Sequence, residues 1–160
     1  MLVALLIVIV IGGGLAYGIS YGISYATGKE SVQAQRLVAP ATGTAAGVTI
    51  RVEKVDTTAH YTKVELTATN RNRQSATLPL FGNCQIVDGS GAILKPGSLI
   101  GGLDSIDVPP NGTAISVTIT FRGRLSPTTT TMTLSFNTIF GILSEERSLQ
   151  VTGIKLKPET

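Results

Sequence analysis

The sequence predicts an α+β protein in which one long N-terminal hydrophobic helix is followed by an all-β antiparallel sandwich. Residues 1–28 contain no charged side chain, and about 20 apolar residues are enough to cross a membrane as a helix. From Val48 onward, apolar residues recur at every second position, which is typical of strands with one buried face. We therefore predict a hydrophobic helix over 1–38, a linker over 39–47 and a β-sandwich domain over 48–160.

The predicted helix continues beyond its apolar part. Residues 29–38 consist mainly of helix-forming side chains, and Pro40 then disfavours continuation. A helix ending there would be about 55 Å long. We expect the base of this helix to be amphipathic. Its apolar side chains would pack on the following domain: Val32, Leu37 and Val38. Its charged side chains would face water: Lys29, Glu30 and Arg36.

Glycines recur at every fourth position of the apolar stretch, at Gly14, Gly18 and Gly22, with Ser20 and Ser24 between them. Each glycine lowers helix stability in water by about 1 kcal/mol relative to alanine. Because glycine has no Cβ, it lets a second helix approach closely, so we interpret these residues as a helix-packing face. The alternative is that glycine is simply more frequent in membrane helices.

The remainder of the chain contains short alternating segments separated by turn residues, which predict seven or eight strands of an antiparallel sandwich. The turn signals are Asp88-Gly89-Ser90-Gly91 and Pro109-Pro110-Asn111-Gly112. The predicted strands lie within residues 48–55, 62–70, 78–88, 92–95, 113–121, 131–139 and 147–156.

Composition argues against catalysis, cofactors and metals. Cys84 is the only cysteine and His60 the only histidine, so neither an intramolecular disulfide nor a zinc site of four Cys and His ligands can form. We expect Cys84 to be a small buried apolar residue rather than a nucleophile. No phosphate-binding or dinucleotide-binding glycine motif is present. The basic residues are scattered and tryptophan is absent, so we expect no nucleic-acid partner.

One modification site is suggested by the sequence. Asn111, Gly112 and Thr113 form an N-glycosylation triplet in a predicted exposed turn. The alternative is an ordinary turn, because Asn-Gly is a common turn dipeptide.

The arrangement resembles a type IV pilin, and more closely the archaeal kind, which includes the flagellin-like filament proteins. The resemblance is carried by the apolar N-terminus Met1 to Ile11, the long helix to about Val38 and the β-domain from Val48. It implies a leader removed ahead of the apolar segment, helices packed into a filament core and β-domains exposed outside. Bacterial pilins usually carry Glu at the fifth position, where this chain has Leu5. Met1 is either a processed N-terminus or an ordinary initiator.

The β-domain is also similar to immunoglobulin-like domains of membrane-anchored surface proteins. The similarity lies in the strand pattern around residues 63–80, Asp88-Gly89-Ser90-Gly91 and residues 108–121. Such domains are binding or spacer modules. The predicted fold is therefore a hydrophobic helix followed by an immunoglobulin-like antiparallel sandwich.

These observations lead to two hypotheses, and both place the chain at the cell surface or outside the cell. In the first, the chain is a structural subunit of a pilus-like filament. Residues 1–28 would lie in the membrane before assembly, and copies of the chain would then join through their helices. In the second, it is a single-pass membrane-anchored surface protein whose β-domain binds another protein or an envelope layer. A surface or host receptor is a further expected partner, and an enzyme on the β-scaffold is the least favoured hypothesis.

Overall fold

The computed structural model of the chain describes residues 28–97 and 102–159. Within these ranges the chain forms eleven strands and no helix, so this part of the protein is all-β and the predicted α+β class is wrong for it. Residues 1–27 of the predicted helix lie outside the described residues. Nothing in the described ranges would serve as a helical membrane span.

Residues 28–38, predicted as the base of the helix, are extended instead. They contain strand β1 (Ala34–Gln35), which pairs with the end of β3 (Val48–Thr57). The amide of Gln33 donates to the Thr57 carbonyl over 2.8 Å. Intrinsic helix propensities differ by less than about 1 kcal/mol per residue, so pairing with a distant strand can override them. We call residues 28–38 the N-terminal strap.

The predicted linker also contributes to the domain. Within it, β2 (Ala41–Ala45) pairs with the first half of β3, from Ala41 opposite Val52 to Ala45 opposite Val48. The β1 and β2 strands therefore follow the same edge of β3, one after the other. The register of β3 against β4 shifts between Val52 and Lys54, which marks a β-bulge.

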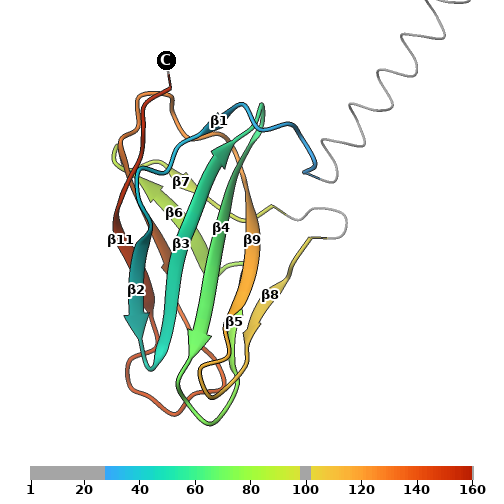
Figure 1. The fold of residues 1–160 in the computed structure, drawn as a ribbon, viewed down its shortest axis with the longest axis vertical. Helices are drawn as coiled ribbons and strands as arrows, with labels where there is room; N and C mark the ends of the chain where they lie inside the picture. The colour runs from blue at the N-terminus through green and yellow to red at the C-terminus, as the bar shows by residue number, and fades with distance from the viewer. Residues whose placement is uncertain (1–27, 98–101, 160) are drawn as a thin grey trace, which may run out of the picture.

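Two antiparallel sheets and a short strand pair make up the domain (Figure 1). The larger sheet has the order β1-β3-β4-β9, with β2 also paired to β3, and the second has the order β11-β10-β6-β7. The pair is β5-β8. The strands not yet given bounds are β4 (Tyr61–Asn70), β5 (Ala76–Pro79), β6 (Cys84–Asp88), β7 (Ile93–Leu94), β8 (Ser105–Val108), β9 (Ile115–Arg122), β10 (Thr131–Phe136) and β11 (Leu149–Lys155).

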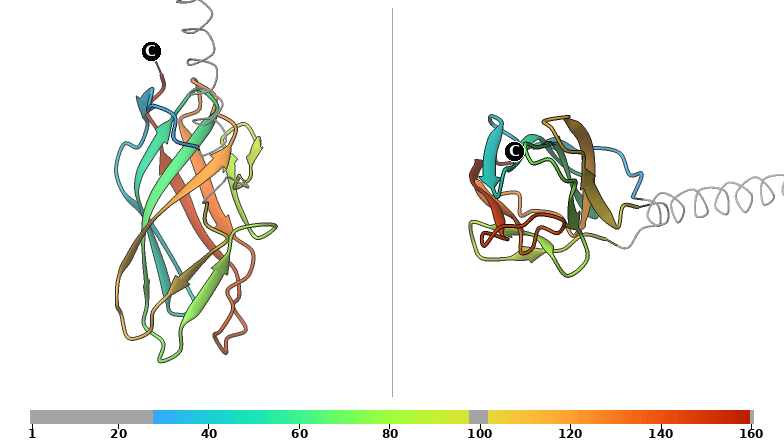
Figure 2. Two further views of the ribbon diagram at one scale, coloured as in Figure 1. Left: turned by 90° about the vertical axis from the view of Figure 1, so that its right-hand side faces the viewer. Right: turned by 90° about the horizontal axis from the view of Figure 1, so that it is seen from below.

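The sheets face each other around a common core (Figure 2). At one side β2 lies against β11, where a Cβ on Gly43 would stand only 2.1 Å from the Gln150 carbonyl oxygen. At the other side an isolated bridge joins Pro96 to Phe121 of β9. Both lateral edges of the larger sheet are thus covered over part of their length, which limits the exposed strand edge.

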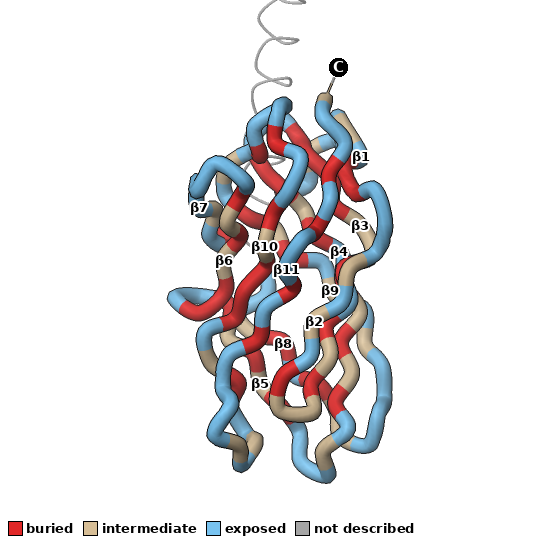
Figure 3. The backbone as a smooth tube through the Cα atoms, turned by 90° about the vertical axis from the view of Figure 1, so that its left-hand side faces the viewer, coloured by how far each residue is buried: buried red, intermediate tan, exposed pale blue. Residues whose placement is uncertain are grey.

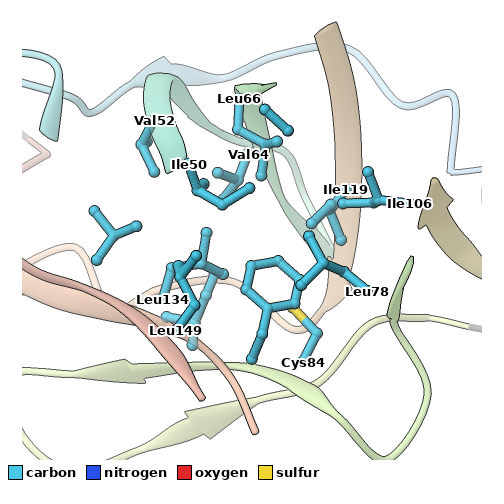
Figure 4. Packing of buried hydrophobic residues seen from close by; sticks show 14 of the residues in the cluster. Ile50, Val52, Val64, Leu66, Leu78, Cys84, Ile106, Ile119, Leu134 and Leu149 are labelled. Carbon is cyan, nitrogen blue, oxygen red and sulfur yellow. The ribbon is translucent and has the colours of Figure 1, made fainter. Parts of the chain in front are cut away.

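Alternating apolar side chains fill the space between the sheets. Ile50 and Val52 of β3 and Leu66 of β4 are fully buried and face Leu134 and Leu149 of the second sheet (Figure 4). Each such side chain contributes about 1.5–3 kcal/mol when it is removed from water. Along each strand, buried positions alternate with more exposed positions (Figure 3). The periodicity that predicted these strands is therefore confirmed by their burial.

One predicted strand is divided in the structure. Residues 78–88 supply the end of β5 and all of β6, with a turn around Asn83 between them. The Asn83 side-chain amide donates to the carbonyls of Pro79 and Thr138, each over 2.9 Å. The turn is thus held by one hydrogen bond to a residue four positions earlier and another to a residue 55 positions later.

Candidate functional site: the attachment end of the domain

The strap, the turn between β3 and β4, the end of β9 and the C-terminal residues 156–159 all lie at one end of the domain (Figure 1). We call this the attachment end, because the chain enters the domain here from residues 1–27. The opposite end, which we call the distal end, carries the loops 71–75, 109–114 and 137–148 (Figure 1).

The strap is fixed to the domain from its third residue. The Glu30 carboxylate receives hydrogen bonds from the Thr58 hydroxyl over 2.8 Å and from the His60 amide over 3.0 Å. Its other oxygen lies 2.7 Å from Nδ1 of His60. The Lys63 ammonium donates to the Glu30 carbonyl over 3.3 Å. Four contacts therefore hold this one residue against the β3–β4 turn.

Two opposing effects act on the pKa of Glu30. Burial alone would raise the pKa, but hydrogen bonds from Thr58 and His60 outweigh it and hold the pKa below its usual value. The carboxylate lies between the hydroxyl and the imidazole. In a nucleophilic triad the imidazole occupies the middle position, so this arrangement fits a structural clamp rather than a catalytic one.

Arg36 is the largest fully buried side chain at this end. It was expected to face water, but it is 1% exposed. Its guanidinium donates to Glu159 over 2.8 Å and to the carbonyl of Thr129 over 2.7 Å. It also donates to three further carbonyls, those of Ser126, Pro127 and Lys157. Burial is tolerated because its donors have partners, as a buried charge requires.

Glu159 completes this network from the C-terminal side. Its carboxylate contacts Arg36 and Arg124 and accepts a hydrogen bond from the Thr57 hydroxyl over 2.7 Å. Burial would raise its pKa, yet the hydrogen bonds from Arg124, Thr57 and Arg36 lower it overall. Arg124 also donates to the side chain of Gln33. The strap, β3, the residues after β9 and the C-terminal segment are thus joined through two arginines and one carboxylate.

The burial of the apolar residues in the strap also differs in part from the prediction. Leu37 is buried, as expected, and forms an isolated bridge with Leu156. Val32 and Val38 are 50% and 52% exposed, although they were expected to pack on the domain. An extended strap places residues on faces that a helical pattern does not predict.

The residues predicted to form a helix-packing face all fall within residues 1–27. Gly14, Gly18, Gly22, Ser20 and Ser24 lie outside the described residues, so their role stays a prediction.

Asn111 lies in the exposed turn between β8 and β9, with φ of 62° followed by 79° at Gly112. This turn is at the distal end, and the Gly112 amide donates to the Asn70 carbonyl over 2.7 Å. The predicted turn is confirmed, and the glycan remains a prediction.

Cys84 is buried at 3% exposure among apolar residues of the core (Figure 4), which confirms its expected role as a small apolar residue. Desolvation raises the pKa of its thiol, so the reactive thiolate is disfavoured. In the two described ranges, no group of three or more His, Cys, Asp or Glu side chains is placed to bind a metal ion.

Comparisons with known proteins add one weak similarity. No protein-family model matches the chain, and a search of curated proteins found no match. Among solved structures, the chain is similar to the yjhA protein from Bacillus subtilis, with a TM-score of 0.45 and 17% identity, over 60% of this chain and 76% of that chain. Neither the pilin resemblance nor the immunoglobulin resemblance is tested by these results, and both stay predictions.

Proposed function

We propose that the chain is a single-pass membrane-anchored surface protein. The uncharged residues 1–28 hold it in a membrane, and the β-domain is displayed close to the membrane surface as a binding module. The observation that carries this proposal is the clamped strap. The uncharged N-terminal stretch ends at Gly28, and Glu30, two residues later, is already bonded to the body of the domain. Such a short, fixed connection suits the display of a domain at a set distance from an anchor.

The distal end is the surface that this arrangement presents to a partner. Leu143 and Phe140 lie in the loop 137–148 and are 96% and 53% exposed. Arg71 and Arg73 are exposed in the neighbouring loop after β4. Aromatic and arginine side chains are enriched at protein interfaces relative to the rest of the surface. We propose that another protein or an envelope layer binds here, with Asn111 as a glycan acceptor beside it.

Membrane retention tests the anchor. Two charges within the apolar stretch, as in Leu6→Lys with Ile9→Lys, should each disfavour insertion by about 2.5 kcal/mol or more. We expect at least a tenfold loss of chain from carbonate-washed membranes. The matched control is Leu143→Lys with Ile93→Lys, which changes the same residue types at positions 96% and 54% exposed. Equal retention of both variants would overturn the proposal.

The filament subunit is a second candidate, which the four-residue glycine spacing favours. Gly18→Leu with Gly22→Leu should then abolish self-association of the full chain, while Gly13→Leu, off that spacing, should not. Chemical cross-linking in membranes and imaging of sheared cell-surface material would measure it. Detergent-resistant fibres would favour the filament, and a monomer or small complex in mild detergent would favour the anchored domain.

A further inference from the structure

We infer that the attachment end binds the anionic headgroups of the membrane that anchors the chain. This inference rests on the proposed membrane anchor and names what the domain contacts beside that anchor. It follows from the distribution of charge over the domain, from the burial of the acidic groups at this end and from the shortness of the connection to residues 1–27.

Exposed cations are concentrated at the attachment end. Two of them, Lys155 and Lys157, are placed here by backbone hydrogen bonds to the strap. The Val38 amide donates to the Lys155 carbonyl, and the Lys157 amide donates to the Arg36 carbonyl. A third, Arg122, ends β9 and its amide donates to the carbonyl of Lys95. The exposed cations at this end are Lys29, Lys95, Arg122, Lys155 and Lys157, together with Arg124, which pairs with Glu159.

The acidic groups at the same end do not offset this charge at the surface. The side chains of Glu30, Asp56 and Glu159 are 8%, 8% and 10% exposed. Asp56 pairs with Lys54, Glu159 pairs with both Arg36 and Arg124, and Glu30 accepts hydrogen bonds from Thr58 and His60. Three exposed carboxylates lie elsewhere, at Asp107 within β8 and at Glu145 and Glu146 in a distal loop. Two others lie beside the outer face of β9: Glu65 is the register partner of Thr118, and Asp104 precedes β8. The attachment end therefore presents a positive surface.

The connection keeps this surface close to the anchor. Only Gly28 and Lys29 separate the residues before the domain from the clamped Glu30. Two extended residues span at most about 7 Å, which is shorter than the Debye length of about 8 Å at physiological ionic strength. Lys29 thus lies within electrostatic range of a headgroup layer, and basic side chains are attracted to whichever membrane surface contains anionic lipid.

A hollow in this surface offers room for a headgroup. It has a volume of about 250 Å³ and lies between the start of the strap, β9 and residues 96–97 and 102–103. Its wall includes Lys29 and Lys63, the second of which also donates to the Glu30 carbonyl, and its apolar part includes Leu80 and Leu103. The hydroxyl-bearing residues Thr118 and Thr120 line it too. Phosphate oxygens accept hydrogen bonds from ammonium and hydroxyl groups. The inference commits to lipid phosphate as the occupant, because the anchor itself brings that surface within reach.

Lysine acylation of the full chain in lipid nanodiscs tests the inference. We compare discs of phosphatidylcholine with discs that contain phosphatidylglycerol, and measure each lysine by mass spectrometry. We expect acylation of Lys29, Lys95, Lys155 and Lys157 to be at least threefold slower in the anionic discs, with the difference lost at 0.5 M salt, where screening is strong. An Arg73→Lys chain supplies a distal reference lysine of unchanged charge, whose rate should be the same in both discs.

Charge reversal supplies the second arm. Lys95→Glu with Lys155→Glu and Lys157→Glu should abolish the slowing at Lys29, whereas Arg71→Glu with Arg73→Glu and Arg147→Glu, an equal charge change on the distal loops, should preserve it. A chain that fails to enter either disc would overturn the membrane anchor, and this inference with it. A chain that enters both discs with equal lysine rates would overturn the inference alone. Slowing in neutral discs upon addition of soluble glycerol phosphate would also overturn it, because free phosphate would then suffice.

Discussion

Arg36 shows how one buried charge can connect segments that are distant in sequence. Its guanidinium reaches Glu159, which is 123 positions away, and the carbonyl of Thr129, which is 93 positions away. A charge in the interior is tolerated only when its partners are fixed, so the surrounding segments must all be in place together. We therefore expect the strap and the C-terminal segment to be cooperative parts of the domain rather than independent tails.

Removing this charge should destabilise the domain strongly. In Arg36→Met, the carbonyls of Thr129 and Lys157 lose their donor and Glu159 loses one of its cations. We expect the free energy of unfolding of the full chain in detergent to fall by about 3 kcal/mol. Arg51→Met is the control, because Arg51 is 54% exposed and pairs with Glu53 at the surface, and it should cost about 0.5 kcal/mol. Similar losses in urea titrations of both variants would show that the Arg36 network is not important for stability.

Glu30 should make the stability of the attachment end depend on pH. Its pKa is lowered in the folded state, so its carboxylate stabilises the domain above the unfolded pKa of about 4.3. This contribution is lost as the pH falls through the lower, folded pKa. Glu30→Gln should therefore be less stable than the original chain at pH 7, and the difference should shrink below about pH 4.

Thermal unfolding between pH 3 and pH 7 measures this difference, with Glu65→Gln as a control for removing one exposed negative charge. If the stability difference between Glu30→Gln and the original chain stayed constant across this range, the carboxylate would not be the stabilising group.

At the scale of the elements, the contact between β2 and β11 depends on a missing side chain. A Cβ on Gly43 would lie 2.1 Å from the Gln150 carbonyl oxygen and 3.1 Å from the Val151 Cα, both of which are backbone atoms that cannot rotate away. Gly43→Ala should thus separate the strands and destabilise the domain by about 1–3 kcal/mol. Thr42→Ala, at the neighbouring exposed position, should have little effect on chemical denaturation. Equal stability of the two variants would mean that the close contact is not required.

The elements also show what a sequence pattern can predict. β3, β4, β9, β10 and β11 were found because their side chains alternate between core and surface over six or more residues. β1, β2 and β8 were missed. The first two are short or consist of small residues such as ATGTA, which carry no alternation, and β8 has four residues. These strands form because they pair with strands that are distant in sequence, and a local sequence pattern does not indicate such pairing.

The attachment end could not be predicted for the same reason. Residues 29–38 are good helix formers, so local propensity indicates a helix, whereas Arg36 and Glu30 gain their partners from residues that are far away in sequence. The sequence indicates only that charged residues follow the apolar stretch, at Lys29, Glu30 and Arg36. Tertiary contacts outweighed a propensity difference of tenths of a kcal/mol per residue.

At the scale of the whole molecule, the strap makes the domain and its attachment one unit. The domain is held by its entering segment, by the turn that follows β3 and by the C-terminal residues, all at one end (Figure 1). The distal loops are left facing away from that end, with Leu143 almost fully exposed. A fixed attachment and a free opposite end are what a displayed binding module requires.

Amide hydrogen exchange of the full chain in lipid nanodiscs tests the clamped strap most directly. The amides of Gln33, Arg36 and Val38 donate to carbonyls of Thr57, Val55 and Lys155, respectively. We predict that they exchange about as slowly as the amides of β3, and at least 100-fold more slowly than those of the exposed residues 145–148. Exchange of these three amides at the rate of residues 145–148, or helical backbone chemical shifts over residues 29–38, would contradict the account.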